Sequence, residues 1–263
     1  MQEATLELPG VYSLEFLSLL FLALVSPYIF ICGIYCYHFI GRKNGRKLRK
    51  SDDRPLVEHI NDWHSALFKI EGISAVVIYM FLGLSLSLLY PGALGALVPQ
   101  SVKTLTCTIH PFLLFLHFFV FDSLMWIIHY VQHHWRWLYY KTHSVHHTIK
   151  SPTMIVALTG YLPDTCLLIL VPLHATIAII PGANFLTVFL FSVGSLFHLH
   201  CIHSEFQHLW DPLFRALGIA NSYDHHVHHL QPRKNLAHFF VILDKAFGTY
   251  CDPATLRKIV INE

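Results

Sequence analysis

The apolar run PFLLFLHFFVF, Pro111–Phe121, is followed closely by HYVQHHWRWLYYKTHSVHH, His129–His147. The first belongs to an apolar segment from roughly Thr104 to Ile128, long enough to cross a bilayer as a helix. The second holds six histidines in nineteen residues. Imidazole is the commonest metal-binding side chain and is largely neutral near pH 7. This order of segments predicts a metal site at the end of a membrane helix.

The composition of the whole chain also favours a membrane environment. Of its 263 residues, 54% are apolar and only 13% are charged, and the mean hydropathy is +0.48. A soluble domain usually carries about 25% charged residues. The six cysteines form no CxxC pair and no disulfide framework, so we expect reduced thiols. No Lys or Arg precedes Arg42, which argues against a secretory signal, and no lipidation motif is found.

Hydropathy predicts an all-α fold built as a multi-span membrane bundle. The apolar segments are Val11–Ile40, Ile73–Tyr90, roughly Thr104–Ile128, and Met154–Phe197. Pro163-Asp164, Pro172 and Pro181-Gly182 interrupt the last segment, which favours a helical hairpin over a single span. We therefore expect about four main transmembrane helices and a cytosolic helical cap that carries the histidine-rich di-metal site.

The basic residues predict the orientation. The loop Arg42–Arg54 carries seven of the eighteen Lys and Arg, and only Lys103 falls on the opposite side. The positive-inside rule places this loop in the cytosol and the N-terminus outside it. Two further spans and the hairpin then bring both His129–His147 and His203–His229 to the cytosolic side. The loop is interpreted as a topology determinant, with binding to anionic lipid as the alternative.

Three histidine clusters have the spacing of metal ligands. His129 and His133 share one helix face, a spacing at which two imidazoles reach one ion. The pattern HxxHH follows twice, also with its histidines on one helix face, and His203 is a further candidate. The candidate ligands are His129, His133, His143, His146, His147, His203, His225, His228 and His229. One tetrahedral ion needs about four ligands, so this number favours two ions.

The other histidines are not among the nine candidate ligands. We expect satisfied or interfacial side chains at His38, His59, His64, His110, His117 and His238. Roles as outer partners of the ligands, or as alternative ligands, stay open for His134, His174, His198, His200, His208 and His226. The absence of HExxH, of GxSxG and of a Gly-rich phosphate loop disfavours a zincin, a hydrolase and a nucleotide enzyme. The basic residues form a juxtamembrane loop rather than a groove, so we expect no nucleic-acid partner.

Further motifs accompany the clusters between Leu116 and Asp252, about half of the chain. They are Asp122, Ile202-His203-Ser204, Asn235 and the ending Leu243-Asp244-Lys245-Ala246-Phe247-Gly248-Thr249. Together with the clusters they resemble the fatty acid hydroxylase superfamily, which includes sterol desaturases, sterol methyl oxidases, cholesterol 25-hydroxylases and fatty acid hydroxylases. The chain departs from the superfamily pattern at Tyr161, where many members have a histidine. It departs again at Leu236-Ala237, an aromatic–Gly pair elsewhere, and at Leu243, usually Trp.

The resemblance implies a non-haem di-iron centre held by the nine histidines, with O2 as co-substrate. It also implies electrons from NAD(P)H through a reductase and a b-type cytochrome, and residence in the endoplasmic reticulum membrane. Outer partners implied for the ligands are Asp122, Tyr161, Asp164, His226, Asn235 and Asp244. The chain is expected to comprise N-terminal spans with the basic loop at 1–110, a catalytic domain at 111–252 and a tail at 253–263.

The resulting hypothesis is a lipid hydroxylase. A sterol is preferred as substrate, as in cholesterol 25-hydroxylases, because the chain is compact, has no fused cytochrome domain and lacks the extra histidine at Tyr161. A fatty acyl hydroxylase and a desaturase remain as enzyme alternatives. A membrane metal-binding or transport protein is the alternative without catalysis, but transporters often show internal repeats and this chain shows none.

Overall fold

The computed structural model describes residues 29–30, 32–44, 48, 108–154, 157 and 162–254. Within these residues the structure is helical, apart from one isolated antiparallel bridge between Ile219 and Phe240. The expected all-α class is therefore confirmed for this part of the chain. The predicted span Ile73–Tyr90 and most of Val11–Ile40 lie outside the described residues, as do Tyr161 and most of the basic loop.

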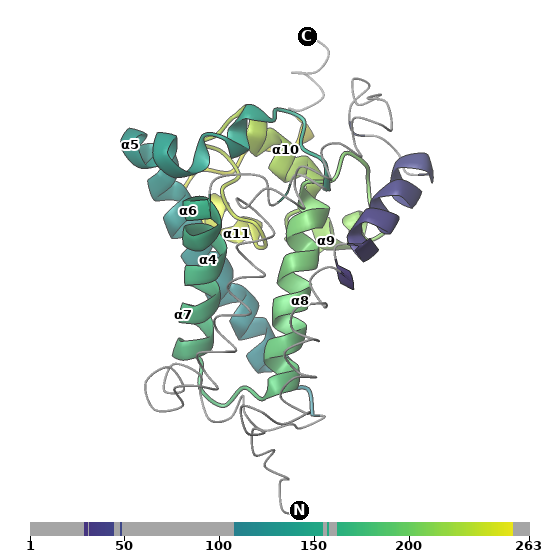
Figure 1. Cartoon of the computed structure of the whole chain (residues 1–263), viewed down its shortest axis with the longest axis vertical. Coiled ribbons are helices and arrows are strands. Elements are labelled where there is room, and N and C mark those ends of the chain that lie inside the picture. Colours follow the sequence, from purple (N-terminus) through teal and green to yellow (C-terminus); the bar gives the residue numbers. More distant parts are fainter. Residues whose placement is uncertain are drawn as a thin grey trace, which may run out of the picture.

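Three apolar helices form the body of the structure. They are α4 (Pro111–His134), α7 (Val171–Ile179) and α8 (Phe185–Ile202), and α4 packs against both of the others. All three run along the long axis in Figure 1. Phe121 and Met125 of α4, Phe191 of α8 and Leu168, which lies just before α7, are buried together. These contacts join α4, α7 and α8 into one packed unit.

Among the described residues, only α4 is long and apolar enough to cross a membrane. It has 24 residues, and its most apolar window has a mean hydropathy of 1.9. The helical stretches Pro163–Ile179 and Leu186–Ile202 are also apolar but shorter than the roughly 20 residues that a bilayer requires. The predicted bundle of four spans therefore stays a prediction, for which α4 is one candidate span.

The segment that follows the first HxxHH motif forms the expected helical hairpin. Short α6 (Leu162–Thr165) and the π-helical turn η5 (Cys166–Leu170) lead into α7, whose first turn contains Pro172. The chain reverses after α7, where Gly182 adopts a φ of 82°. Asn184 then caps α8, because its Oδ1 accepts from the amide of Thr187 at 2.9 Å. The reversal returns the end of α8 to the level at which α6 begins.

Helix α4 is longer than the apolar segment from roughly Thr104 to Ile128, as expected if His129 and His133 share one helix face. Helix α4 continues through the histidines to His134, and the backbone becomes extended at Trp135 (φ −100°, ψ 98°). The helix continues because the imidazoles of His129 and His133 have buried partners and do not need water. Both histidines therefore lie on the last turns of α4.

Short helices cover the end of the bundle where α4 and α8 finish. They are α5 (Arg136–Leu138), η2 (Tyr139–His143), η3 (His146–Thr148), α9 (Asp211–Ala216), α10 (Ser222–Leu230) and α11 (Val241–Ala246). Figure 1 shows α5 and α10 above α7 and α8. Helix α10 begins with a capping box, in which Asn221 and Asp224 accept each other's backbone amides. This helical cap agrees with the predicted one, while its cytosolic side stays a prediction.

Candidate metal centre

The structure brings all nine candidate histidines together in two groups. The first histidine group is His129, His133, His143, His147 and His228, and the second histidine group is His146, His203, His225 and His229. Within each group one nitrogen per ring lies within 4.8 Å of the others, and all nine side chains are buried. Groups of five and four suit two ions with about four ligands each.

Each HxxHH motif contributes to both groups. His143 and His147 lie in the first group, whereas His146 lies in the second. The second motif has the reverse arrangement, because only its middle histidine, His228, lies in the first group. Residues four apart in a helix, such as His225 and His229, differ by about 40° around the axis. Adjacent residues, such as His228 and His229, differ by about 100°. The i, i+4 pair of each motif therefore stays in one group, while the remaining histidine, which shares the same broad helix face, belongs to the other group.

The first motif also departs from a regular helix. His143 ends the π-helical turn η2, and His146 begins the 3-10 helix η3. The second motif lies on the regular helix α10. The two motifs thus have different local conformations yet divide between the groups in the same manner.

The Nδ1 atom of five of these histidines faces a fixed oxygen. The contacts are His129 to Leu236 O (2.8 Å), His143 to Asp164 Oδ2 (2.8 Å), His203 to Leu199 O (2.7 Å), His228 to Lys234 O (2.8 Å) and His229 to Ile149 O (2.9 Å). A carbonyl or carboxylate oxygen can only accept, so each Nδ1 donates its proton. In a neutral ring the Nε2 atom then carries a lone pair, which is the form that binds a metal.

These lone pairs face one another. Nε2 of His129 lies 3.0 Å from Nε2 of His143, although both rings hold their proton on Nδ1. Burial, reinforced by neighbouring imidazoles, holds the pKa of His228 and of His229 well below the usual range, so these rings are neutral. Facing lone pairs repel unless a cation lies between them. The donor set therefore fits a bound metal ion in each group.

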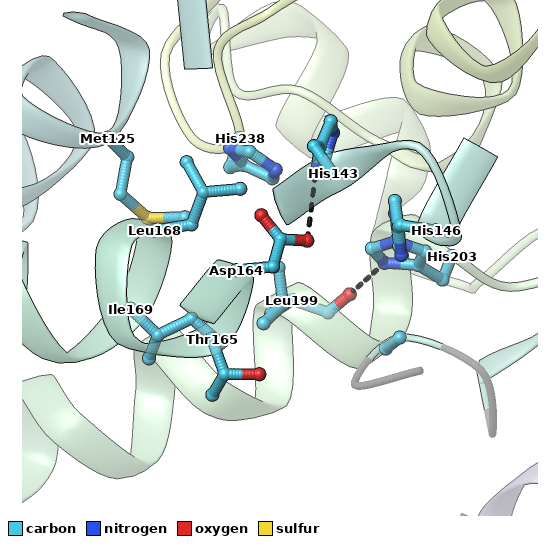
Figure 2. A pocket seen from close by; sticks show the side chains of 11 residues that line it. Met125, His143, His146, Asp164, Thr165, Leu168, Ile169, Leu199, His203 and His238 are labelled. Atoms are coloured by element: carbon cyan, nitrogen blue, oxygen red, sulfur yellow. Dashed lines mark hydrogen bonds and ion pairs between the residues drawn. The ribbon is translucent and has the colours of Figure 1, made fainter. Parts of the chain in front are cut away.

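Asp164 orients His143 from outside the first histidine group. Its Oδ2 accepts from His143 Nδ1 at 2.8 Å, and its Oδ1 accepts from Gln132 Nε2 at 2.9 Å. Gln132 also contacts Thr142 Oγ1 at 2.8 Å. Figure 2 shows Asp164 directly below His143. Sequence reasoning selected Asp164 but missed Gln132, whose only signal is its place between His129 and His133.

Two buried carboxylates hold the loop that follows α10. Asp244 accepts from the amides of Leu236 and Ala237, from Trp126 Nε1 and from Thr249 Oγ1. Asp122 accepts from the amides of His238, Phe239 and Phe240. The carbonyl of Leu236, which receives the His129 proton, belongs to this loop. Both acids therefore act on the centre through the backbone rather than by touching a metal.

The remaining predicted partners also lie at the centre's edge. Asn235 takes a left-handed conformation (φ 51°), and its side chain binds the backbone of Asp224 and Cys251. It thereby fixes the turn beside the Lys234 carbonyl that receives the His228 proton. His226 instead contacts the Ser204 carbonyl at 2.9 Å and joins neither group.

His238 differs from the bystander that the sequence suggested. Its ring stacks on His129 at 5.0 Å and lies 5.3 Å from His225, so it touches both groups. Its Nδ1 is buried and has no hydrogen-bond partner among the described residues. The position depends on the loop held by Asp122, and no local spacing marks it. His59 and His64 lie outside the described residues.

A small cavity of about 30 Å³ opens beside both groups, enough for one or two small molecules. Its polar wall contains His143, His146, His203 and His238, and its other wall is largely apolar. Figure 2 shows Met125, Leu168 and Ile169 on that apolar side. A reactant placed here would lie next to both histidine groups.

A helical bundle that carries two buried all-histidine groups is typical of a metalloprotein with two metal ions. Comparison with known proteins agrees with this class. The sequence matches the fatty acid hydroxylase family over residues 114–249, more than half of the chain, so the chain belongs to that family. This confirms the resemblance inferred from the motifs. No solved structure matches the chain.

Three curated relatives have names that refer to squalene or cholesterol. The chain is 33% identical over 168 residues to an alternative squalene epoxidase of Phaeodactylum tricornutum (64% of this chain, 48% of that protein). It is 28% identical over 142 residues to cholesterol 25-hydroxylase-like protein 1, member 2, of Danio rerio (51% and 48%). It is 30% identical over 178 residues to a cholesterol 25-hydroxylase-like protein of Caenorhabditis elegans (65% and 58%). The chain thus spans about half the length of these relatives.

Proposed function

We propose that the protein is a membrane-bound, non-haem di-iron oxygenase that hydroxylates a lipid C–H bond. The observation that carries this proposal is the pair of buried histidine groups, whose lone pairs converge beside one small cavity. Imidazole ligands alone suit several transition metals, so the choice of iron rests on the family. The nine histidines named above would be the ligands.

The overall reaction is R–H + O2 + 2 e⁻ + 2 H⁺ → R–OH + H2O, with NAD(P)H as the source of the two electrons. Bound iron would supply the activation of O2. The protein's own residues orient the ligands: Asp164 acts directly on His143, while Asp244 and Asp122 act through the loop Leu236–Phe240. Met125, Leu168 and Ile169 supply the apolar side of the neighbouring cavity.

A sterol-related lipid is the proposed substrate, because the curated relatives are named for cholesterol and squalene. The squalene epoxidase relative supports a second reaction on the same centre. In that reaction an alkene, O2, two electrons and two protons give an epoxide and water. Hydroxylation of a fatty acyl chain and desaturation are alternatives that product analysis separates.

A basic depression supports delivery of the electrons by a separate protein. It has a volume of about 610 Å³, and its lining includes His133 of the first histidine group together with Arg136, Arg233 and Lys234. Cations around such a depression attract an acidic protein and orient its approach. We place here the contact with a b-type cytochrome that a reductase supplies. The proposal puts this face in the cytosol and the chain in the endoplasmic reticulum membrane.

The test combines lipid profiling with metal analysis. Cells with and without the protein are compared for hydroxylated and epoxidised sterols, squalene products and hydroxylated fatty acids. Protein purified without a histidine tag is analysed for metals, and about two iron ions per chain are expected from nine ligands. Oxidised lipid formed by protein that lacks metal would refute the proposal.

A further inference from the structure

A second cavity lies deeper in the helical bundle, beyond the small cavity at the metal centre. Its volume is about 170 Å³. Its walls come from α4, from η5 and α7, from α8 and from the loop that carries His238, and they are predominantly apolar. Leu170, Leu173, Leu196 and Phe239 are typical members of its lining.

The two cavities share part of their walls. Met125, Ile169, Leu199 and His238 line both of them. Figure 2 shows these four residues around the small cavity, with His238 opposite Leu199. A group that fills the deeper cavity therefore ends next to the histidine centre.

The size and polarity of the deeper cavity restrict its occupant. An apolar cavity of about 150 Å³ is known to accept benzene, so this one accommodates roughly six carbon atoms in a compact shape. No Lys or Arg lies in its lining, and the single acid, Asp122, is already bound to three amides. A carboxylate or phosphate group would therefore lose its hydration without gaining a Lys or Arg partner.

We propose that this cavity binds the branched, dimethyl end of an isoprenoid chain and presents it to the metal centre. Cholesterol at position 25 and squalene at either end both carry two methyl groups on one carbon. Such an end, with its neighbouring carbons, matches the volume and the apolar lining. The proposal rests on the proposed function and specifies its substrate: the lipid enters with this branched end first, and the rest of the lipid stays outside the cavity.

The test uses a squalene analogue with a diazirine at one dimethyl end, applied to the full chain in lipid nanodiscs. Light-induced crosslinks are mapped by peptide mass spectrometry, so neither turnover nor metal is required. We expect crosslinks on residues 168–173 and 192–199, which excess squalene or cholesterol removes and palmitic acid does not. Crosslinks that palmitic acid removes equally well would overturn the proposal, whereas their retention in a protein without oxidase activity would refute only the proposed function.

Matched variants locate the site. Ser195→Phe fills the cavity from α8, and Val193→Phe adds the same ring to the exposed face of that helix. Ser195→Phe should lower crosslinking roughly tenfold, as expected for an overfilled site, whereas Val193→Phe should leave it unchanged. Leu173→Phe fills the cavity from the opposite wall and replaces Ser195→Phe if that variant does not fold. Equal crosslinking in a folded cavity variant and in Val193→Phe would exclude this cavity.

Discussion

Replacing Asp164 by Asn should weaken metal binding without removing any ligand. The carboxylate receives two donors on two oxygens, His143 Nδ1 at 2.8 Å and Gln132 Nε2 at 2.9 Å. Asn offers one oxygen, and its NH2 group faces the other donor. If His143 loses its acceptor, the ring is free to rotate or to move its proton to Nε2. Loss of such a partner costs roughly 10–100-fold in metal affinity or activity.

The assay titrates metal-loaded protein with a chelator and measures bound metal per folded chain. Asp252→Asn is the matched control, because Asp252 is exposed and its carboxylate contacts the amide of Ala254, away from the centre. We expect Asp164→Asn to release metal at a much lower chelator concentration than the control. Equal release by the two variants would mean that the contact between Asp164 and His143 does not control the ligand.

Further outcomes follow from the same structure. His133→Ala and His225→Ala should each lose at least one of the two metal ions, whereas exposed His134→Ala should retain both by elemental analysis. Asp244→Ala should lower the unfolding midpoint in detergent clearly, because each abandoned buried donor costs about 1–3 kcal/mol; an unchanged midpoint would contradict its bracing role. Arg233→Glu should slow turnover with a protein electron donor but not with dithionite, and equal slowing would argue against docking in the basic depression. A C-terminal tag should be digested by protease in sealed microsomes, since the positive-inside rule places that end in the cytosol.

The spacing of the histidines allowed the centre to be predicted because helix geometry is local. Residues four apart fall on nearly the same side of a helix. Each of the three such pairs therefore stays within a single group, namely His129 with His133, His143 with His147, and His225 with His229. The hairpin was equally predictable, since Pro181 and Gly182 interrupt an otherwise apolar segment. In both cases the decisive interactions join residues that are close in sequence.

Long-range interactions could not be predicted in the same way. The division of each HxxHH motif between the groups depends on how α10 meets the turn η2–η3, more than seventy residues away in the chain. The place of His238 depends on Asp122, which binds its amide from another element. The carboxyl end of α4 at His134 does not follow from hydropathy, because the apolar segment stops near Ile128 whereas the imidazoles that follow it partner one another.

The division of the two motifs has an evolutionary consequence. A site made of separate modules could lose one ion through the loss of one motif, but here the loss of either HxxHH motif removes ligands from both groups. To replace only the second histidine group by side chains that bind no metal would require substitutions in η3, at the end of α8 and in α10. The neighbouring ligands of the first group, His147 and His228, would have to stay in place. The loss of a whole motif therefore leaves neither ion with its full set of ligands. The two halves of the centre are therefore expected to be gained and lost as one inherited unit.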